Sequence, residues 1–183
     1  MKKLVYAAVF FAFLFISCEK SSASRIPATV RVSSDKSTVH LDQEDEELAR
    51  IARHARDTLP AFFRHLLRPA KDEGNFRVKY PFRADRTSGF SMEQVWLSEI
   101  QYKDGVYYGV VDNTPFYISS IKKGDTVTFN ADEITDWMYT SGEKIIGGYS
   151  IKYLLDMLPE HSEEQQRIMN MLSEPPDSPR TPD

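Results

Sequence analysis

The chain has 183 residues, of which 41% are hydrophobic, and it carries a formal net charge of −4 and one cysteine. This length accommodates one domain of roughly 100–150 residues with appendages, and the composition is that of a globular protein. The acidic balance argues against nucleic acid as a partner, because phosphate binding requires clustered Lys and Arg. A single cysteine also excludes an intramolecular disulfide.

Residues 1–17 form a predicted lipoprotein signal peptide. Lys2 and Lys3 precede the apolar run Leu4–Ile16, which is too short for a comfortable transmembrane helix but suits the core of a signal peptide. Cys18 follows almost directly. The arrangement resembles a bacterial lipoprotein signal, which implies that the Cys18 thiol takes a diacylglyceryl group and becomes the new N-terminus. An incidental cysteine behind an ordinary secretory signal is the alternative.

The resemblance implies a protein of the cell envelope, held to a membrane by fatty acyl chains such as palmitate. Its expected location is the periplasmic face of the outer membrane or the cell surface. Buried acyl chains contribute roughly 0.8 kcal/mol per methylene, so a multiply acylated cysteine is a durable anchor. Residues 18–42 are rich in Ser and Thr, and we predict a lipid anchor and flexible tether here, with a short strand at Thr29–Val32.

The strongest periodic pattern lies in Gln43–Arg68, where apolar residues recur at helical spacing and acidic residues crowd the first turn. Pro60 removes a backbone donor, which predicts a kink or a restart near Thr58. His54 and His65 lie on this helix but are not spaced as metal ligands on one turn. The sequence therefore predicts a long amphipathic helix without a metal site.

Strand patterns follow this helix. Alternating apolar residues, with turn residues between the segments, indicate antiparallel strands. The predicted extended segments are Phe76–Tyr80, Ser91–Tyr102, Val106–Val111, Phe116–Ile121 and Thr126–Phe129.

The stretch Gly124–Tyr149 combines turn, strand and helix signals. Asn130 is placed to cap a helical turn over Ala131–Glu133. If that turn continues, Ile134 and Trp137 face the same way, because they are three residues apart. The agreement of these local signals predicts a compact core here.

The C-terminal part contains two further predicted helices. Ser150 is placed to cap a helix that ends near Leu158, and Ser162 with Gln165 forms a capping box for a shorter helix. Proline-rich residues 174–183 contain few large apolar side chains, which indicates disorder.

These elements predict an α+β domain over residues 43–158, in which a kinked N-terminal helix packs on a small antiparallel sheet. Residues 159–183 are predicted as a short helix and a disordered Pro-rich tail. A partly open small β-barrel with helices is the alternative fold.

The order of motifs resembles the YegJ-like family of bacterial proteins of unknown function. The matching motifs are Thr58–Phe62, Phe76–Lys79, Glu93–Trp96, Tyr108–Pro115, Gly124–Phe129, Ile134–Met138 and Gly147–Ser150. The resemblance covers most of the mature domain and implies a lipoprotein-type member. The family has no established activity to carry over, and a loose association with toxin–immunity systems is all that it implies.

Three carboxylates are the main candidates for chemistry. Asp132 and Asp136 are four residues apart, so one helical face would present both, and Glu133 adjoins them. Paired carboxylates serve general acid–base catalysis or bind calcium. Acidic residues at a helix N-terminus are far commoner as simple dipole partners, however. The sequence therefore predicts no confident catalytic residue, no metal and no cofactor.

A candidate surface site remains, made of aromatic, amide and acidic side chains that sheet pairing would bring together. Its predicted members are Trp96, Asn113, Asp132, Asp136 and Trp137. Aromatic residues in strands are more often core residues, and Trp137 is interpreted first in that way.

Two functional classes follow from these patterns. The first is a lipid-anchored, non-catalytic binding module for an envelope protein or cell-wall partner, which includes an immunity or inhibitor protein against a toxin. The second is a small envelope hydrolase that uses the acidic residues. The sequence favours the first class, because no nucleophile motif such as Gly-x-Ser-x-Gly is present.

Overall fold

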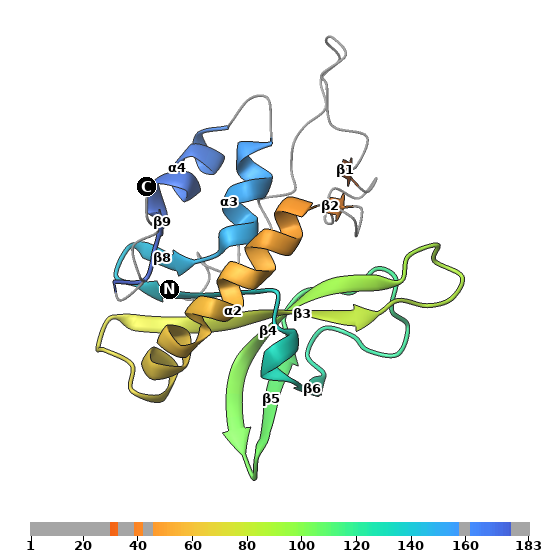
Figure 1. The fold of residues 1–183 in the computed structure, drawn as a ribbon, viewed down its shortest axis with the longest axis horizontal. Coiled ribbons are helices and arrows are strands. Elements are labelled where there is room, and N and C mark those ends of the chain that lie inside the picture. The colour runs from red at the N-terminus through yellow and green to blue at the C-terminus, as the bar shows by residue number, and fades with distance from the viewer. Residues whose placement is uncertain (1–29, 33–38, 42–45, 158–161, 177–183) are drawn as a thin grey trace.

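The computed structural model describes residues 30–32, 39–41, 46–157 and 162–176 (Figure 1). The predicted signal peptide, Cys18 and most of the predicted tail lie outside the described residues. The elements are β1 (Val30–Val32), β2 (Val39–Leu41), α2 (Glu46–Leu67), β3 (Glu73–Arg83), β4 (Met92–Lys103), β5 (Val106–Val111), β6 (Thr126–Phe129), the 3-10 helix η1 (Ala131–Glu133), β7 (Asp136–Ser141), β8 (Lys144–Gly147), α3 (Tyr149–Asp156), α4 (Glu163–Met171) and β9 (Leu172–Ser173).

Seven strands form one sheet in the order β6-β5-β4-β3-β7-β8-β9, and β1 pairs with β2 in a separate two-stranded sheet. All neighbours in the large sheet are antiparallel except β8 and β9, which are parallel. In the part of the chain that the structure describes, β6 and β9 are the two edges, so the sheet is open. The predicted α+β fold is confirmed, and the barrel alternative is not adopted.

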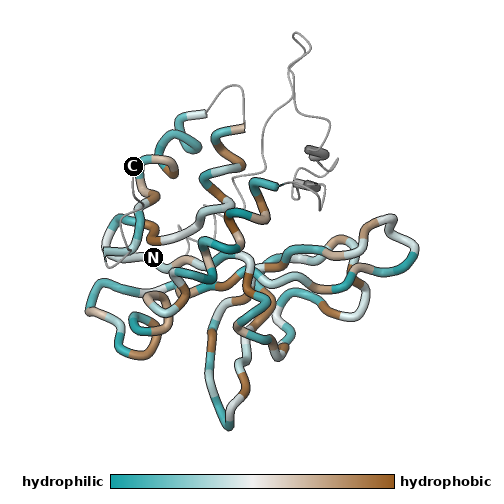
Figure 2. Tube along the Cα trace, in the orientation of Figure 1, coloured by the Kyte–Doolittle hydropathy of each residue, from teal (hydrophilic) through white to brown (hydrophobic). Residues whose placement is uncertain are grey.

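Helix α2 covers one face of this sheet, because its apolar residues lie on one side at helical spacing (Figures 1 and 2). Two acidic residues in its first turn complement the helix dipole. Pro60 is exposed, and the helix continues past it to Leu67, so no restart occurs near Thr58. The Thr58 hydroxyl donates to the carbonyl oxygens of His54 and Ala55.

The two faces of the sheet build two apolar clusters, because successive residues of a strand point to opposite sides. On the α2 face, Val78, Leu97 and Trp137 are buried in the larger cluster. The smaller cluster joins the other face of the sheet to α3 and α4. Its buried members are Trp96, Met138, Ile145, Leu155 and Ile168.

Two of the helix caps predicted from the sequence are present in the structure, and one is not. Asn130 caps η1 by accepting from the Asp132 backbone N–H, and Ser162 with Gln165 forms the predicted capping box. Ser150 does not cap α3, because Gly148 is the N-cap and Ser150 already lies within the first turn of the helix. The segment 116–121, predicted to be extended, forms bends rather than a strand.

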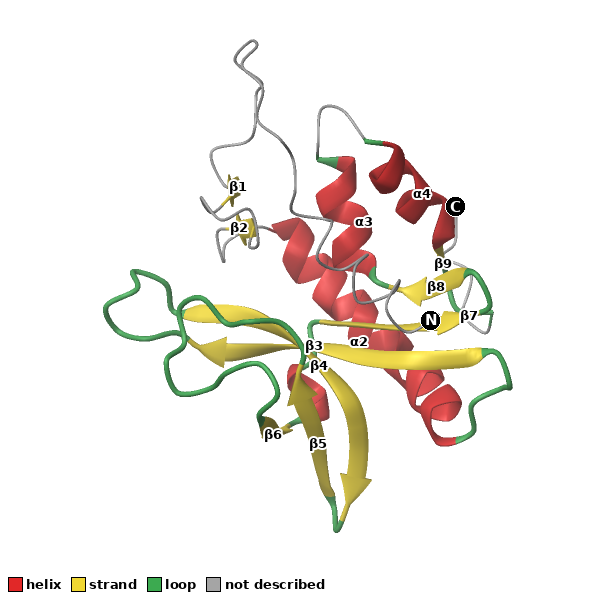
Figure 3. Ribbon diagram, turned by 180° about the vertical axis from the view of Figure 1, so that it is seen from behind, coloured by secondary structure: helices red, strands yellow, loops and turns green. Residues whose placement is uncertain are grey.

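The sheet forks between β3 and β4 (Figures 1 and 3). These strands pair only from Val78–Leu97 to Arg83–Met92. Beyond that point β3 continues beside β7 alone, and β4 continues beside β5 alone. The β4–β5 hairpin therefore diverges from β3 as a separate arm, and its Tyr107 ring stacks on Phe63 of α2.

Candidate functional site

The candidate site is centred on Asp136 at the beginning of β7. Lys79 of β3 lies opposite Asp136 on one side and opposite Trp96 of β4 on the other. Residues directly opposite each other on paired strands point to the same face. Pairing of β7, β3 and β4 therefore gathers an acid, a base and an indole on the sheet face that α2 does not cover.

The Asp136 side chain is fully buried, at 0% exposure, and its carboxylate accepts four hydrogen bonds. The backbone N–H groups of Trp137, Tyr149 and Ser150 donate to it at 2.8, 3.2 and 2.8 Å, and the Ser150 hydroxyl donates at 2.5 Å. Burial raises the pKa of Asp136, and the Lys79 charge and these donors oppose that rise. The carboxylate therefore fastens the first turn of α3 to β7.

Lys79 completes this centre. Its Nζ donates to the Ser150 hydroxyl at 2.8 Å and lies 5.2 Å from the ring centroid of Trp96. Although the residue as a whole is half-buried, its ammonium group lies inside the protein, and this burial lowers the pKa of Lys79 while Asp136 opposes the change. The result is a continuous chain of hydrogen bonds from Lys79 through Ser150 to Asp136.

A serine hydroxyl that lies between an amine and a carboxylate has neighbours of the kind that activate nucleophiles in some enzymes. Here the Ser150 hydroxyl accepts from Lys79 and donates to Asp136, and the residue is only 5% exposed. Two hollows on the surface of the described structure are lined by other residues. The arrangement therefore joins β3, β7 and α3 and offers no room for a substrate beside the hydroxyl.

The structure brings three of the five predicted site residues together. The Asn113 side-chain oxygen accepts from the Trp96 backbone N–H at 2.7 Å, and Lys79 connects Trp96 with Asp136. Trp137 points to the opposite face, into the core under α2.

The expectation that Asp132 and Asp136 share a helical face is wrong. The 3-10 helix ends at Glu133, and Asp136 already belongs to strand β7. Asp132 is exposed. Glu133, also exposed, accepts a hydrogen bond from the Tyr80 hydroxyl. For the same reason Ile134 and Trp137 do not lie on one helical face.

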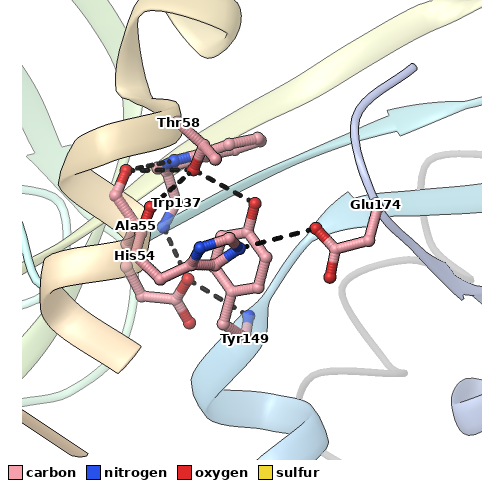
Figure 4. A network of polar contacts seen from close by, with 7 residues as sticks. His54, Ala55, Thr58, Trp137, Tyr149 and Glu174 are labelled. Carbon is pink, nitrogen blue, oxygen red and sulfur yellow. Dashed lines mark hydrogen bonds and ion pairs between the residues drawn. The ribbon is translucent and has the colours of Figure 1, made fainter. Parts of the chain in front are cut away.

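Trp137 anchors a second polar network, on the α2 side of the sheet (Figure 4). Its Nε1 donates to the carbonyl oxygen of Ala55 at 2.8 Å. Tyr149 of α3 lies edge-on to Trp137, and its hydroxyl is 3.1 Å from that of Thr58 on α2. Burial is the main cause that raises the pKa of Tyr149. Trp137 and Tyr149 thus connect α2, β7 and α3.

The same network reaches the end of the described chain. His54 lies edge-on to Tyr149 with ring centroids 4.6 Å apart, and its Nε2 is 3.7 Å from a carboxylate oxygen of Glu174. Glu174 directly follows β9, so this contact holds the C-terminal strand near α2.

Sequence reasoning missed Lys79, Ser150 and Glu93. Glu93 is buried, and its carboxylate accepts from the backbone N–H groups of Phe116 and Tyr117, both at 2.7 Å. Glu93 therefore holds the long segment between β5 and β6. The available signal was an acidic or basic residue within an apolar strand, which is unusual unless the charge has a partner.

In the part of the chain that the structure describes, no group of three or more His, Cys, Asp and Glu side chains is arranged to hold a metal ion. Among those same residues, no helix has the length and apolar character needed to cross a membrane.

Comparison with known proteins shows the family. Residues 45–171 match the family described as "Uncharacterized protein conserved in bacteria (DUF2314)". The chain is 33% identical over 115 residues to "Uncharacterized protein YegJ" of Escherichia coli (strain K12), covering 63% of this chain and 71% of that protein.

A second relative is longer. The chain is 32% identical over 131 residues to "Putative ankyrin repeat protein NMB1133/NMB1171" of Neisseria meningitidis serogroup B (strain ATCC BAA-335 / MC58), covering 69% of this chain and 51% of that protein. The chain thus spans about half the length of this relative. No solved structure matches the chain significantly. Because the family match spans α2, the large sheet as far as β8, and α4, the chain belongs to the bacterial family DUF2314, and its predicted kinship with YegJ-like proteins is confirmed.

Proposed function

We propose that this protein is a lipid-anchored binding module of the bacterial envelope, whose domain acts by contact with another protein rather than by catalysis. The observation that carries this proposal is the state of Asp136. Both of its oxygens accept hydrogen bonds from within the fold, and none of its surface is exposed. The best catalytic candidate of the sequence is thus occupied in holding α3 to the sheet.

Exposed apolar side chains support contact with a partner. Leu67 at the end of α2 is 72% exposed, Tyr102 on the β4–β5 arm is 58% exposed, and Phe116 in the segment after β5 is 48% exposed. Large aromatic and aliphatic side chains supply most of the binding energy at protein interfaces. An immunity or inhibitor protein would be one form of this function.

The anchor is supported by the sequence before the domain. Lys2, Lys3 and the apolar run Leu4–Ile16 precede Cys18, the one cysteine of the chain. Cys18→Ala should remove the added lipid mass and leave an unprocessed precursor or a soluble form. Mass spectrometry of the N-terminal peptide and membrane fractionation measure this. A wild-type protein that fractionates as soluble, with no mass added at Cys18, contradicts the anchor.

Photocrosslinking in living cells tests the binding role. A photoreactive phenylalanine analogue in place of Tyr102 or Phe116 should give a discrete crosslinked adduct after irradiation. The same analogue in place of Glu143, exposed in the β7–β8 turn, is the control and should give none. If all three positions give the same pattern, or if none gives an adduct, the proposed binding role is wrong.

A further inference from the structure

The fork between β3 and β4 leaves backbone of both strands without a strand partner on one side. Register pairs between the two strands end at Val78–Leu97. Within the described residues, Glu73 and Gly74 pair only toward β7, and Gln101–Lys103 only toward β5. Most of Glu99–Lys103 is exposed, and an exposed strand edge offers unpaired N–H and C=O groups to which another strand can add.

A hollow of about 440 Å³ lies in this fork. Its lining comes from both arms, with Phe76 on β3 and Ile100 on β4, and from Leu66 on α2. The volume falls in the range of about 300–1,000 Å³ that is typical of ligand sites. The fork is therefore a concave site between two strands.

Both strands are irregular where they line the hollow. The register of β3 shifts between Gly74 and Arg77, and that of β4 shifts between Ser98 and Gln101. Each shift contains a non-glycine residue with positive φ, Asn75 at 54° and Glu99 at 51°. Such bulges end regular pairing and redirect side chains, and they concentrate at sheet edges and binding sites.

The two sides of the hollow differ in chemistry. Leu66, Phe76 and Ile100 form an apolar side. The other side is charged: Arg77 Nε lies 2.6 Å from Asp112 Oδ2, and Glu99 adds a carboxylate.

We infer that the fork between β3 and β4 binds an extended peptide segment of a partner protein by strand addition. The side chains of an extended strand alternate between two sides. One set would contact Leu66, Phe76 and Ile100, and the other set would face Glu99. Because Arg77 and Asp112 neutralise each other, Glu99 leaves a net negative charge that favours a Lys or Arg in the peptide. Backbone pairing supplies affinity and the alternating side chains supply specificity, as in known cases of strand addition.

This inference rests on the proposed binding function and locates its site. The test uses the full chain in detergent micelles and a displayed library of random octapeptides. Selected peptides should alternate apolar residues with at least one Lys or Arg, and their binding should protect the amides of Glu73–Phe76 and Glu99–Lys103 from hydrogen exchange. Glu99→Lys should weaken binding by about tenfold or more. Glu143→Lys, with the same charge change at a remote exposed turn, should leave binding unchanged.

Several results would overturn the inference. These are a library that gives no binder, binding that survives Glu99→Lys in a variant with wild-type melting temperature, and protection at β6 or β9 in place of the fork. Protection of the fork amides that rises with protein concentration, without added peptide, would show a second copy as the occupant. Cellular crosslinks from Phe116, which lies outside the fork, do not depend on these results, so a wrong site can be distinguished from a wrong function.

Discussion

A buried carboxylate with four internal donors stabilises the fold only while it can accept from all of them. At the residue scale, Asp136→Asn replaces one acceptor oxygen with a donor and leaves the buried ammonium of Lys79 without its counter-charge. Removing one partner of a buried charge pair costs about 3–5 kcal/mol. Denaturant unfolding should show a loss of this size for Asp136→Asn. The exposed Asp132→Asn should change stability by no more than about 0.5 kcal/mol. A loss below about 1 kcal/mol for Asp136→Asn would contradict the structural role.

The raised pKa of Tyr149 predicts a loss of stability at alkaline pH. Its folded pKa is raised above the ordinary value of 10.0, chiefly by burial. The folded state therefore favours the protonated phenol, so this contribution to stability is complete below pH 10 and is lost as the pH rises above 10. Wild-type protein should lose unfolding free energy more steeply above pH 10 than Tyr149→Phe does. The pKa values of Tyr80 and Tyr107 are also raised, but both residues are present in both proteins, so the difference between the two profiles reports on Tyr149. Parallel pH profiles of the two proteins would contradict this, because they would show that Tyr149 ionises as easily in the folded state as in the unfolded state.

At the element scale, the passage from β8 into α3 depends on one glycine. Gly147 has a φ of +80°, and a Cβ on it would lie 2.4 Å from the carbonyl oxygen of Trp137. Gly147→Ala should therefore cost more than about 3 kcal/mol, through a forbidden backbone conformation and a clash with buried backbone. Gly124 has a φ of +93° with nothing within 4 Å, so Gly124→Ala should cost only about 1–2 kcal/mol. Thermal melting followed by circular dichroism measures both, and equal losses would refute the role of the contact with Trp137.

Elements with strong local periodicity could be predicted from the sequence. The apolar stripe of α2, the alternation in β4 and β5, and the caps at Asn130 and Ser162 depend on neighbouring residues alone. The helical reading of 134–137 failed because long-range pairing decides that segment. The Thr135 N–H donates to the carbonyl oxygen of Lys79, and β7 then pairs along β3. No signal within β7 reveals its distant partner.

The candidate site was likewise predicted only in part. The nearness of Trp96, Asn113 and Asp136 was predicted from the idea that paired strands would bring them together. The structure places Trp96 and Asp136 on either side of Lys79, and Asn113 accepts from the Trp96 backbone. Lys79 and Ser150 themselves were missed, because they are 71 residues apart in the chain and meet only after β7 and α3 are in place. The opposite directions of Asp136 and Trp137 follow from strand geometry, which a helical reading hides.

At the scale of the whole molecule, different parts of the fold have different tasks. The buried centre of Lys79, Ser150 and Asp136 holds the sheet to α3. Tyr102 on the β4–β5 arm is 58% exposed and can meet a partner, while its ring neighbour Tyr107 stacks on Phe63 of α2 (Figure 1). A lipid on Cys18 would hold this surface near the membrane.

The central claim is that binding by the arm does not depend on chemistry at the buried centre. The measurement is the yield of the crosslinked adduct from position 102 in cells that carry Ser150→Ala. This substitution removes the hydroxyl between Lys79 and Asp136. We expect Ser150→Ala to lower the melting temperature. Below the melting transition, the adduct yield should equal that of the protein with Ser150 intact. Loss of the adduct from a Ser150→Ala protein that is folded at the temperature of the experiment would contradict the central claim.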